Sequence, residues 1–148
     1  MWTHRRPLHT LIMSVNELFA LDKRVSEFRD LQNLDVQSNQ LTSLPSSFSQ
    51  LQHLTSLNLA RNALSRVPSC ILALTSLVSL DLSDNMLDTL WSQADAEKAG
   101  IAASDVLRSL ATLNLAYNCL STSALVPMPA SLKRLQLSHN LLREPLPI

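Results

Sequence analysis

Serine, histidine and aspartate are all present in this chain, so a hydrolytic triad is the first chemistry to consider. A triad needs a nucleophile oriented by a base, which a third group holds in turn. Ser138 and His139 are adjacent, so on a strand their side chains point in different directions, and Asp84 lies in a separate segment. The other histidines each stand alone, at His4, His9 and His53. The sequence therefore predicts that the protein is not an enzyme.

Glycine and cysteine usage argues against the common cofactor and metal motifs. Gly100 is the only glycine, so no glycine-rich phosphate-binding loop can be written. Cys70 and Cys119 are far apart, and neither has a second ligand at the short spacing of a metal site. We therefore expect no cofactor, no metal ion and no disulfide. Free, largely buried thiols are typical of a reducing compartment, the cytoplasm or the nucleus.

An eleven-residue pattern organises the chain that must position any functional side chain. It reads L-x-x-L-x-L-x-x-N-x-L, and a clear copy runs from Leu54 to Leu64. Leu57 and Leu59 alternate with Asn58, which predicts a short strand whose two leucines enter a core. Asn62 follows at the turn, where its amide can bond backbone groups of its own coil and of the next one.

Six copies of this pattern follow one another. They start at Leu8, Leu31, Leu54, Leu77, Leu110 and Leu132. The starts are 23, 23, 23, 33 and 22 residues apart, so one period holds with a single long unit. The ninth position is asparagine in every copy: Asn16, Asn39, Asn62, Asn85, Asn118 and Asn140. This regularity predicts one solenoid domain over residues 1–148, with parallel strands and return paths that are helical, 3₁₀ or, in the fifth copy, extended.

The long fourth copy carries an insertion at about residues 91–105. It is rich in alanine, and Ser92-x-x-Asp95 resembles a capping box that begins a helix, with Gly100 placed to end it. A longer convex helix is the first interpretation, because insertions in solenoids map to loops on one face. A protruding acidic contact element is the second, since residues 81–105 contain six acidic side chains and one lysine.

Charge and hydropathy point away from nucleic acid and membrane. Twelve basic and twelve acidic residues cancel, so no net charge favours a polyanion or an anionic lipid surface. No stretch approaches 18 unbroken apolar residues, and the residues before Leu8 form no apolar run of signal-peptide length. We expect no nucleic-acid partner, no membrane partner, and a cytoplasmic protein, with the nucleus as the other compartment.

The array resembles the leucine-rich repeat superfamily. The 23-residue spacing with Leu41–Pro45, and its variant Leu64–Pro68, resembles the intracellular, Ras-group-related type. More narrowly, residues 31–64 are similar to the N-terminal repeats of leucine-rich-repeat-containing protein forty and its relatives. The resemblance implies an α/β solenoid: a horseshoe of six repeats with a concave parallel β-sheet and short helices or extended segments on the convex side. It also implies a protein partner on the concave face, with small GTPases and phosphatases among the partners of the family.

A concave face would expose the third, fifth, seventh and eighth residues of each copy. We predict a protein-binding surface of nine such residues: Asp35, Asn58, Arg61, Asp81, Asp84, Asn114, Tyr117, Gln136 and His139. Arginine, tyrosine and histidine are the side chains here most able to anchor a protein interface. The alternative interpretation is that these are ordinary solvated residues, with Arg61 and Asp84 merely pairing across neighbouring strands.

Two functions remain open on the sequence alone. One is a protein-interaction module or scaffold that binds its partner through the concave face, in intracellular signalling. The other is a structural fragment of a longer array with no independent partner, because the last copy stops midway and neither end has a polar cap. Uncapped ends would also allow self-association, since they expose leucines and the edge of a parallel sheet.

Overall fold

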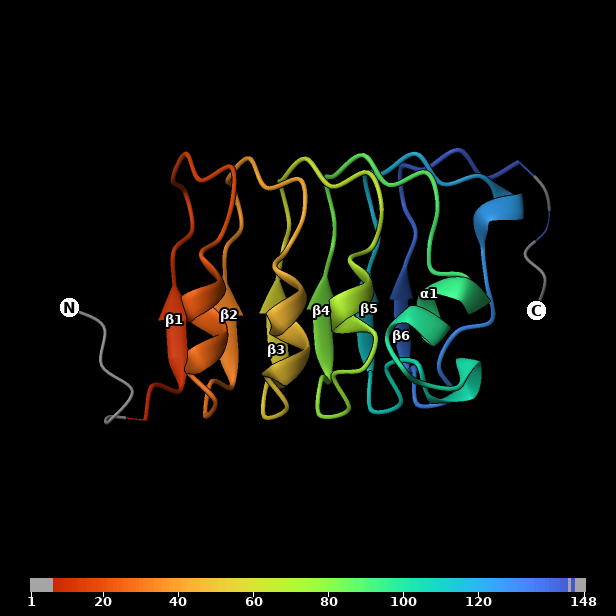
Figure 1. The fold of residues 1–148 in the computed structure, drawn as a ribbon. Helices are drawn as coiled ribbons and strands as arrows, with labels where there is room; N and C mark the ends of the chain where they lie inside the picture. The colour runs from red at the N-terminus through yellow and green to blue at the C-terminus, as the bar shows by residue number, and fades with distance from the viewer. Residues whose placement is uncertain (1–6, 144, 146–148) are drawn as a thin grey trace.

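The computed structural model describes residues 7–143 and residue 145. Each of the six copies contributes one short strand: β1 (Thr10–Ile12), β2 (Asn33–Asp35), β3 (Ser56–Asn58), β4 (Ser79–Asp81), β5 (Thr112–Asn114) and β6 (Arg134–Gln136). The strands form one open, parallel sheet in the order β1-β2-β3-β4-β5-β6. Figure 1 shows the coils stacked side by side from one end of the molecule to the other. This architecture confirms the predicted six-repeat solenoid.

The strand register follows the repeat alignment at every step. Leu11 pairs with Leu34, and the same fourth position pairs across the sheet through to Leu113 and Leu135. The ten extra residues of the fourth copy do not change this register, because Ser79 pairs with Thr112, the third residue of the next copy. In β2 to β5 these leucines are at most 2% exposed, whereas those of β1 and β6 are only partly buried. The core is therefore a continuous aliphatic ribbon that thins at both ends.

Short helices cover the convex side of the sheet, on the near side in Figure 1. They are η1 (Lys23–Glu27), η2 (Ser46–Gln50) and η3 (Ser69–Ile71), all of the 3₁₀ type. Each directs apolar side chains into the ribbon, among them Val25, Phe48 and Ile71. The fifth copy returns through a brief 3₁₀ turn, η5 (Thr122–Ala124), before the chain becomes extended at Leu125. The helical return paths thus take the predicted form, whereas the fifth, predicted to be extended, begins with a 3₁₀ turn and is extended only from Leu125.

The first of these helices begins at a charged cap. Asp22 accepts hydrogen bonds from the backbone N–H of Arg24 and from its guanidinium, the two side chains meeting at 2.8 Å. These hydrogen bonds, together with the positive charge of Arg24, lower the pKa of Asp22 to about 2. The carboxylate therefore stays ionised well into acid and keeps the start of η1 defined.

The insertion forms the longer convex helix that its sequence predicts. Helix α1 (Gln93–Lys98) begins at Ser92, whose hydroxyl accepts from the backbone N–H of Asp95 while the Asp95 carboxylate accepts from the backbone N–H of Ser92. It ends at Gly100, which adopts φ +77°, and the N–H of Ile101 closes back onto the Ala96 carbonyl. A second turn, η4 (Ala103–Asp105), follows. Because α1 packs against η3 and η4, Asp95 and Glu97 of the insertion lie on the convex side, whereas Asp81 belongs to strand β4.

The ninth-position asparagines link neighbouring coils. Asn85 donates to the Leu82 carbonyl of its own coil at 3.1 Å and to the Leu59 carbonyl of the preceding coil at 3.0 Å. Its Oδ1 accepts from the backbone N–H of Leu64, also in the preceding coil, at 3.0 Å. The same bonds recur at Asn39, Asn62, Asn118 and Asn140. The predicted link to the next coil is therefore wrong in direction, because each amide reaches back toward the N-terminus.

Candidate functional site

The eighth residue of each copy occupies a left-handed turn at the end of its strand. Six residues share φ values of 54–57°: Val15, Ser38, Arg61, Asp84, Tyr117 and His139. A residue with a Cβ is less stable in this region by roughly 1–2 kcal/mol, and glycine, asparagine, aspartate and histidine are the residues enriched there. Asp84 and His139 are therefore ordinary occupants, whereas Val15, Ser38, Arg61 and Tyr117 are less usual ones. All six copies share the conformation, so it is a property of the coil, and only the side chain differs from copy to copy.

Four of these side chains form two neighbouring contacts along the rim of the sheet. The rings of Tyr117 and His139 stack with centroids 4.2 Å apart and planes 8° from parallel. Arg61 Nε lies 3.7 Å from Asp84 Oδ2, with both side chains more than 60% exposed. This pairing is the one that the alternative interpretation, ordinary solvated residues, describes. Solvent screening makes such an exposed pair weak, so its geometry matters more than its stability.

The fifth-position side chains contact their own backbone. One oxygen of each accepts a hydrogen bond of 2.9–3.1 Å from the N–H two residues further on, at Asp35, Asn58, Asp81 and Asn114. Asp81 also accepts from the hydroxyl of Ser83 at 2.6 Å. These bonds hold the chain as it leaves the strand for the left-handed turn. Four of the nine predicted binding residues therefore also have a structural role, which alternating strand positions alone could not reveal.

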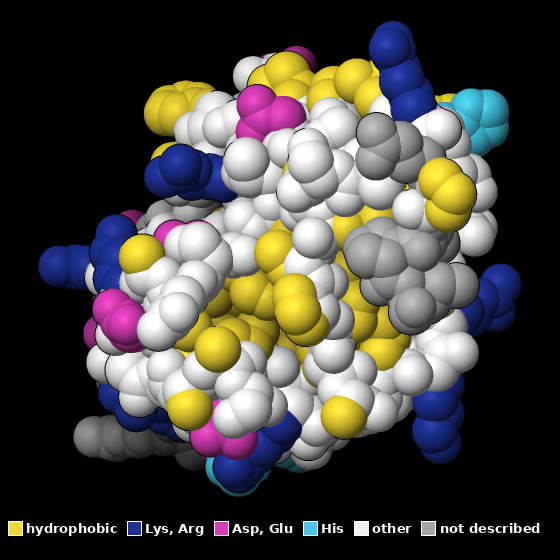
Figure 2. Space-filling view, turned by 90° about the vertical axis from the view of Figure 1, so that its right-hand side faces the viewer, with side chains coloured by type: hydrophobic (Ala, Val, Ile, Leu, Met, Phe, Trp, Pro, Cys, Tyr) yellow, Lys and Arg dark blue, Asp and Glu magenta, His cyan; other side chains and the backbone are white. Residues whose placement is uncertain are grey.

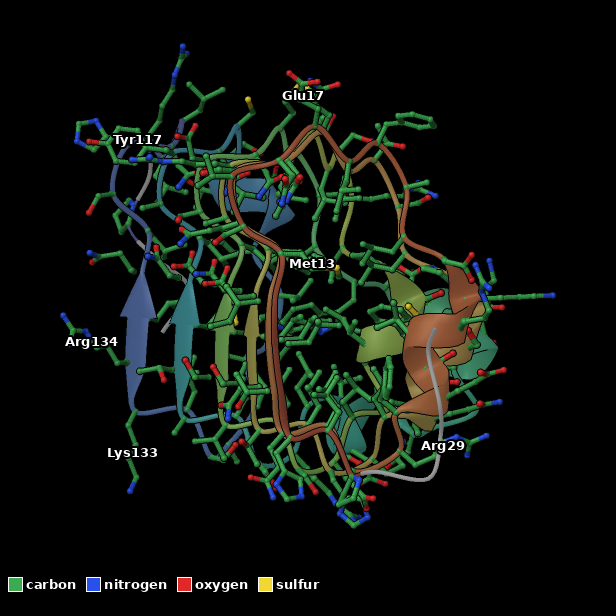
Figure 3. The ribbon with its side chains drawn as sticks, turned by 90° about the vertical axis from the view of Figure 1, so that its left-hand side faces the viewer. Met13, Glu17, Arg29, Tyr117, Lys133 and Arg134 are labelled. Carbon is green, nitrogen blue, oxygen red and sulfur yellow. The ribbon has the colours of Figure 1, made fainter. Side chains whose placement is uncertain are left out.

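The C-terminal part of the sheet carries the remaining candidates. Gln136, at the fifth position of β6, is exposed, and so are His139 and the third-position Arg134. Figure 3 shows Arg134 pointing away from the sheet on the side opposite the helices, and Tyr117 at the rim above the strand ends. Arg29 lies on the helical side. Tyr117, His139 and Arg134 are therefore exposed residues of coils five and six, and Arg134 lies at a third position that the sequence predicts to be exposed, although the nine-residue set does not include it.

The geometry of this face does not suggest catalysis. The Ser138 carbonyl accepts from the N–H of Tyr117, and His139 stacks on that tyrosine, two coils away from Asp84. Within residues 7–143 and 145, no group of three or more His, Cys, Asp or Glu side chains could hold a metal ion. Nor does this part of the chain contain a helix long and apolar enough to cross a membrane.

The two cysteines occupy different environments. Burial raises the pKa of the Cys70 thiol to about 11, so at neutral pH it is a protonated, apolar core group. Cys119 is exposed, which corrects the expectation that both thiols are buried. The sequence indicates this exposure, because Cys119 is the tenth residue of its copy and polar residues, Glu17 and Gln40, occupy the tenth position in the first two copies. Both thiols are free of disulfides.

Comparisons with known proteins identify the repeat. Residues 29–87 match the leucine rich repeat family model. The APL1 leucine-rich repeat domain is 30% identical, with a TM-score of 0.72, over 91% of this chain and 33% of that one. A leucine-rich repeat protein of Leptospira interrogans is 29% identical, with a TM-score of 0.68, over 91% of this chain and 38% of that one.

A third similar structure contains a bound partner. The ectodomain of the plant receptor kinase GASSHO1/SCHENGEN3 from Arabidopsis thaliana, in complex with CASPARIAN STRIP INTEGRITY FACTOR 2, is 26% identical. Its TM-score is 0.69, over 95% of this chain and 16% of that one. This chain thus spans well under half the length of the solved relatives, and no curated sequence matches it significantly. These likenesses show the same repeat fold over most of the chain, and the family model matches its residues 29–87.

Proposed function

We propose that this chain of leucine-rich repeats is a protein-interaction module whose partner binds the concave face along the rim of coils three to six. Leucine-rich repeat domains generally mediate interactions between proteins, and the solved GASSHO1/SCHENGEN3 ectodomain is in complex with CASPARIAN STRIP INTEGRITY FACTOR 2. The contact residues in this proposal are Arg61, Asp84, Tyr117, His139 and Arg134. Asp35, Asn58, Asp81 and Asn114 contribute by holding the turns through their hydrogen bonds to the backbone.

The left-handed conformation of two large side chains carries the proposal: Arg61 and Tyr117 occupy eighth positions with φ of 55° and 57°, where residues of their type are uncommon. Strain at such positions persists when another requirement outweighs it, and functional surfaces are where it gathers. The Tyr117–His139 stack presents a flat, rigid surface that is 56% exposed at the tyrosine. Aromatic and arginine side chains of this kind dominate the binding energy of protein interfaces.

The finer assignments remain proposals that rest on sequence resemblance. We propose an intracellular protein of the Ras-group-related type, in the cytoplasm or the nucleus, because both cysteines are free thiols. A small GTPase or a phosphatase is the partner that this resemblance suggests, in a signalling role. We propose no enzymatic activity, since the rim brings together no nucleophile, base and orienting group.

Affinity capture with three purified chains tests the concave face. The parent is compared with a rim variant carrying Arg61→Glu, Asp84→Arg and Tyr117→Ala, after matching circular dichroism. A convex variant, Arg29→Glu with Asp30→Arg, reverses the same charges at exposed residues away from the rim. We expect proteins that the parent and the convex variant retain and the rim variant loses.

Equal retention by all three chains would contradict the proposal. That result is what the alternative function predicts, in which the chain is a structural part of a longer array with no partner of its own. A protein lost with the convex variant instead would place the interaction on the helical side.

A further inference from the structure

The insertion of the fourth copy forms one wall of a cleft on the convex side. The cleft encloses about 260 Å³ between helix α1 and the two segments that lead into η2 and η3. Figure 1 shows α1 beside η3, on the same side of the sheet as η2. The fourth copy is 33 residues long against 23 in the copies before it, and the added residues make α1 possible. The repeat alone would therefore leave the cleft open on this side.

Helix α1 is anchored where it meets the cleft. Ala96 is 1% exposed and Trp91, just before the helix, is 7% exposed, so the inner side of the helix packs against the core. At the helix start, the Asp95 carboxylate accepts from the N–H and from the hydroxyl of Ser92, at 2.9 and 3.0 Å. Lys98, the last residue of α1, is therefore positioned by an element that is already folded.

The charges around the cleft favour an anion. Arg66 from the third copy and Lys98 from α1 line it, and Asp95 is the one carboxylate among the described residues that do so. Both basic residues are exposed, and neither forms a salt bridge within residues 7–143 and 145. Asp95 already accepts two hydrogen bonds at the helix start. The lining thus carries an excess of one positive charge, with two cations available to a ligand.

Hydroxyl groups complete the polar lining. They belong to Thr42, Ser43, Ser46 and Ser69, and none of these four side chains hydrogen-bonds another described group. A hydroxyl can donate, and the planar guanidinium of arginine can donate to two oxygens of a phosphoryl group at once, while lysine adds a point charge. These donors suit a phosphorylated side chain, which has three acceptor oxygens and a charge of about −1.5 to −2 at pH 7.

The size and lining of the cleft select among ligands that carry a phosphoryl group. Small-molecule and cofactor sites usually enclose about 300–1,000 Å³, which is more than this cleft offers. An aromatic base or a phosphotyrosine ring gains from stacking on another aromatic ring. None of the described residues that line the cleft is aromatic. A phosphoserine or phosphothreonine side chain is small enough to enter, with Leu44 and Val67 at the apolar part of the lining.

A lipid headgroup fits the surroundings less well. Proteins that bind a membrane surface usually add apolar side chains that enter the bilayer beside the basic ones. None of the large apolar residues that are exposed in the described chain, such as Phe19 and Met86, lines the cleft. In Figure 2, apolar side chains gather in the middle of the C-terminal end, whereas charged ones project from the convex side, at the left. A segment of a protein therefore suits the cleft better than a bilayer does.

We propose that this cleft binds a phosphorylated serine or threonine side chain of a partner protein. The phosphoryl oxygens accept from the guanidinium of Arg66, the ammonium of Lys98 and the hydroxyl of Ser69. The insertion serves to bring its lysine to the same cleft as the arginine of the third copy. The site lies on the convex side of the sheet and goes beyond the interaction proposed for the concave rim. Neither interaction requires the other.

Titration of the isotope-labelled chain with phosphopeptides, followed by NMR, tests the proposal. The probe is a mixture of heptapeptides with phosphoserine at the centre and random flanks, and its unphosphorylated counterpart is the blank. We expect saturable shifts of the backbone N–H signals of Ser69 and Lys98 with the phosphorylated mixture alone. Arg66→Gln should raise the dissociation constant about tenfold or more, because a hydrogen-bonded charge pair is lost. Asp95→Asn, which keeps an oxygen for the start of α1, should lower it about twofold, since a like charge is removed.

Arg108→Gln is the control, because it removes a charge from an exposed arginine outside the cleft and should leave the affinity unchanged. Lys98→Gln, at the exposed end of α1, should weaken binding, and unchanged signals outside the cleft show that each variant is folded. Equal shifts from both peptide mixtures, or none, would overturn the proposal, as would Arg66 and Lys98 variants that bind like the parent. Inorganic phosphate that binds as tightly as the phosphopeptides would show a site for the free anion. Binding to phosphoinositide vesicles without binding to the peptides would show a membrane site, and either of these results also overturns it.

Discussion

At the residue scale, the ninth-position asparagines are of two kinds: five of them bond the preceding coil, as Asn85 does, and Asn16 bonds only its own coil. We expect Asn85→Ala to lower the free energy of unfolding by about 3 kcal/mol, because the Leu64 N–H and the Leu59 and Leu82 carbonyls lose buried partners worth about 1–3 kcal/mol each. Asn16→Ala should change it by less than about 1 kcal/mol, since its bonds are exposed and local. Urea unfolding followed by circular dichroism measures both. Losses of equal size would show that the link between coils contributes nothing.

The residue types of the repeat predict only part of how its side chains are placed. The fourth-position leucines and ninth-position asparagines are invariant in type, so their place in the core and in the turn follows from the sequence. Which neighbouring coil each asparagine side chain bonds does not follow from the sequence, because its donors and acceptor could pair with the backbone of either neighbouring coil. The left-handed eighth position is equally hidden, since Val15, Arg61 and Tyr117 share no property that signals a positive φ.

At the element scale, helix α1 depends on its first capping bond. Ser92→Ala removes the hydroxyl that accepts from the Asp95 N–H, a loss of about 1 kcal/mol. Because α1 has only six residues, we expect it to unfold locally while the sheet remains. Hydrogen exchange should accelerate in residues 93–101 and stay unchanged in β5. Ser104→Ala, at an exposed serine in η4, is the control and should leave both segments as they are.

Local signals make this helix predictable from its sequence. The capping box and Gly100 lie within a few residues of the helix that they delimit, so both of its ends follow from nearby residue types. The nine-residue binding surface is harder to predict, because it depends on what else each side chain contacts. The hydrogen bonds that Asp35 and Asn58 accept from the backbone two residues further on depend on the three-dimensional path of the turns.

At the scale of the whole molecule, we propose that residues 1–148 form a single domain that unfolds in one cooperative step. The sheet and the aliphatic ribbon run unbroken through the described coils, so each coil is stabilised by its neighbours. Leu80→Ala should then lower the unfolding free energy by about 3–4 kcal/mol, and Leu11→Ala by about 1–2 kcal/mol, since Leu80 is buried and Leu11 is not fully so.

Calorimetry and urea titration of both variants provide the measurement. A single transition with matching calorimetric and van't Hoff enthalpies is expected for each. Two separate transitions, divided at the insertion, would contradict the single-domain proposal. Similar losses for the two leucines would mean that the end coils are as well packed as the centre.

The backward reach of the asparagines sets an order of events during protein synthesis. A coil that has just left the ribosome still lacks the asparagine side chain that completes its turn, because that asparagine belongs to the next coil to be synthesised. The turn at Leu18, for example, is completed by Asn39 of the second copy. With a period of about 23 residues and elongation at about 5–20 residues per second, each coil waits roughly 1–5 s for its successor. The turn of each coil is therefore completed only after the following repeat has been synthesised. A translational pause after any copy would leave the turn of the last synthesised coil without its asparagine.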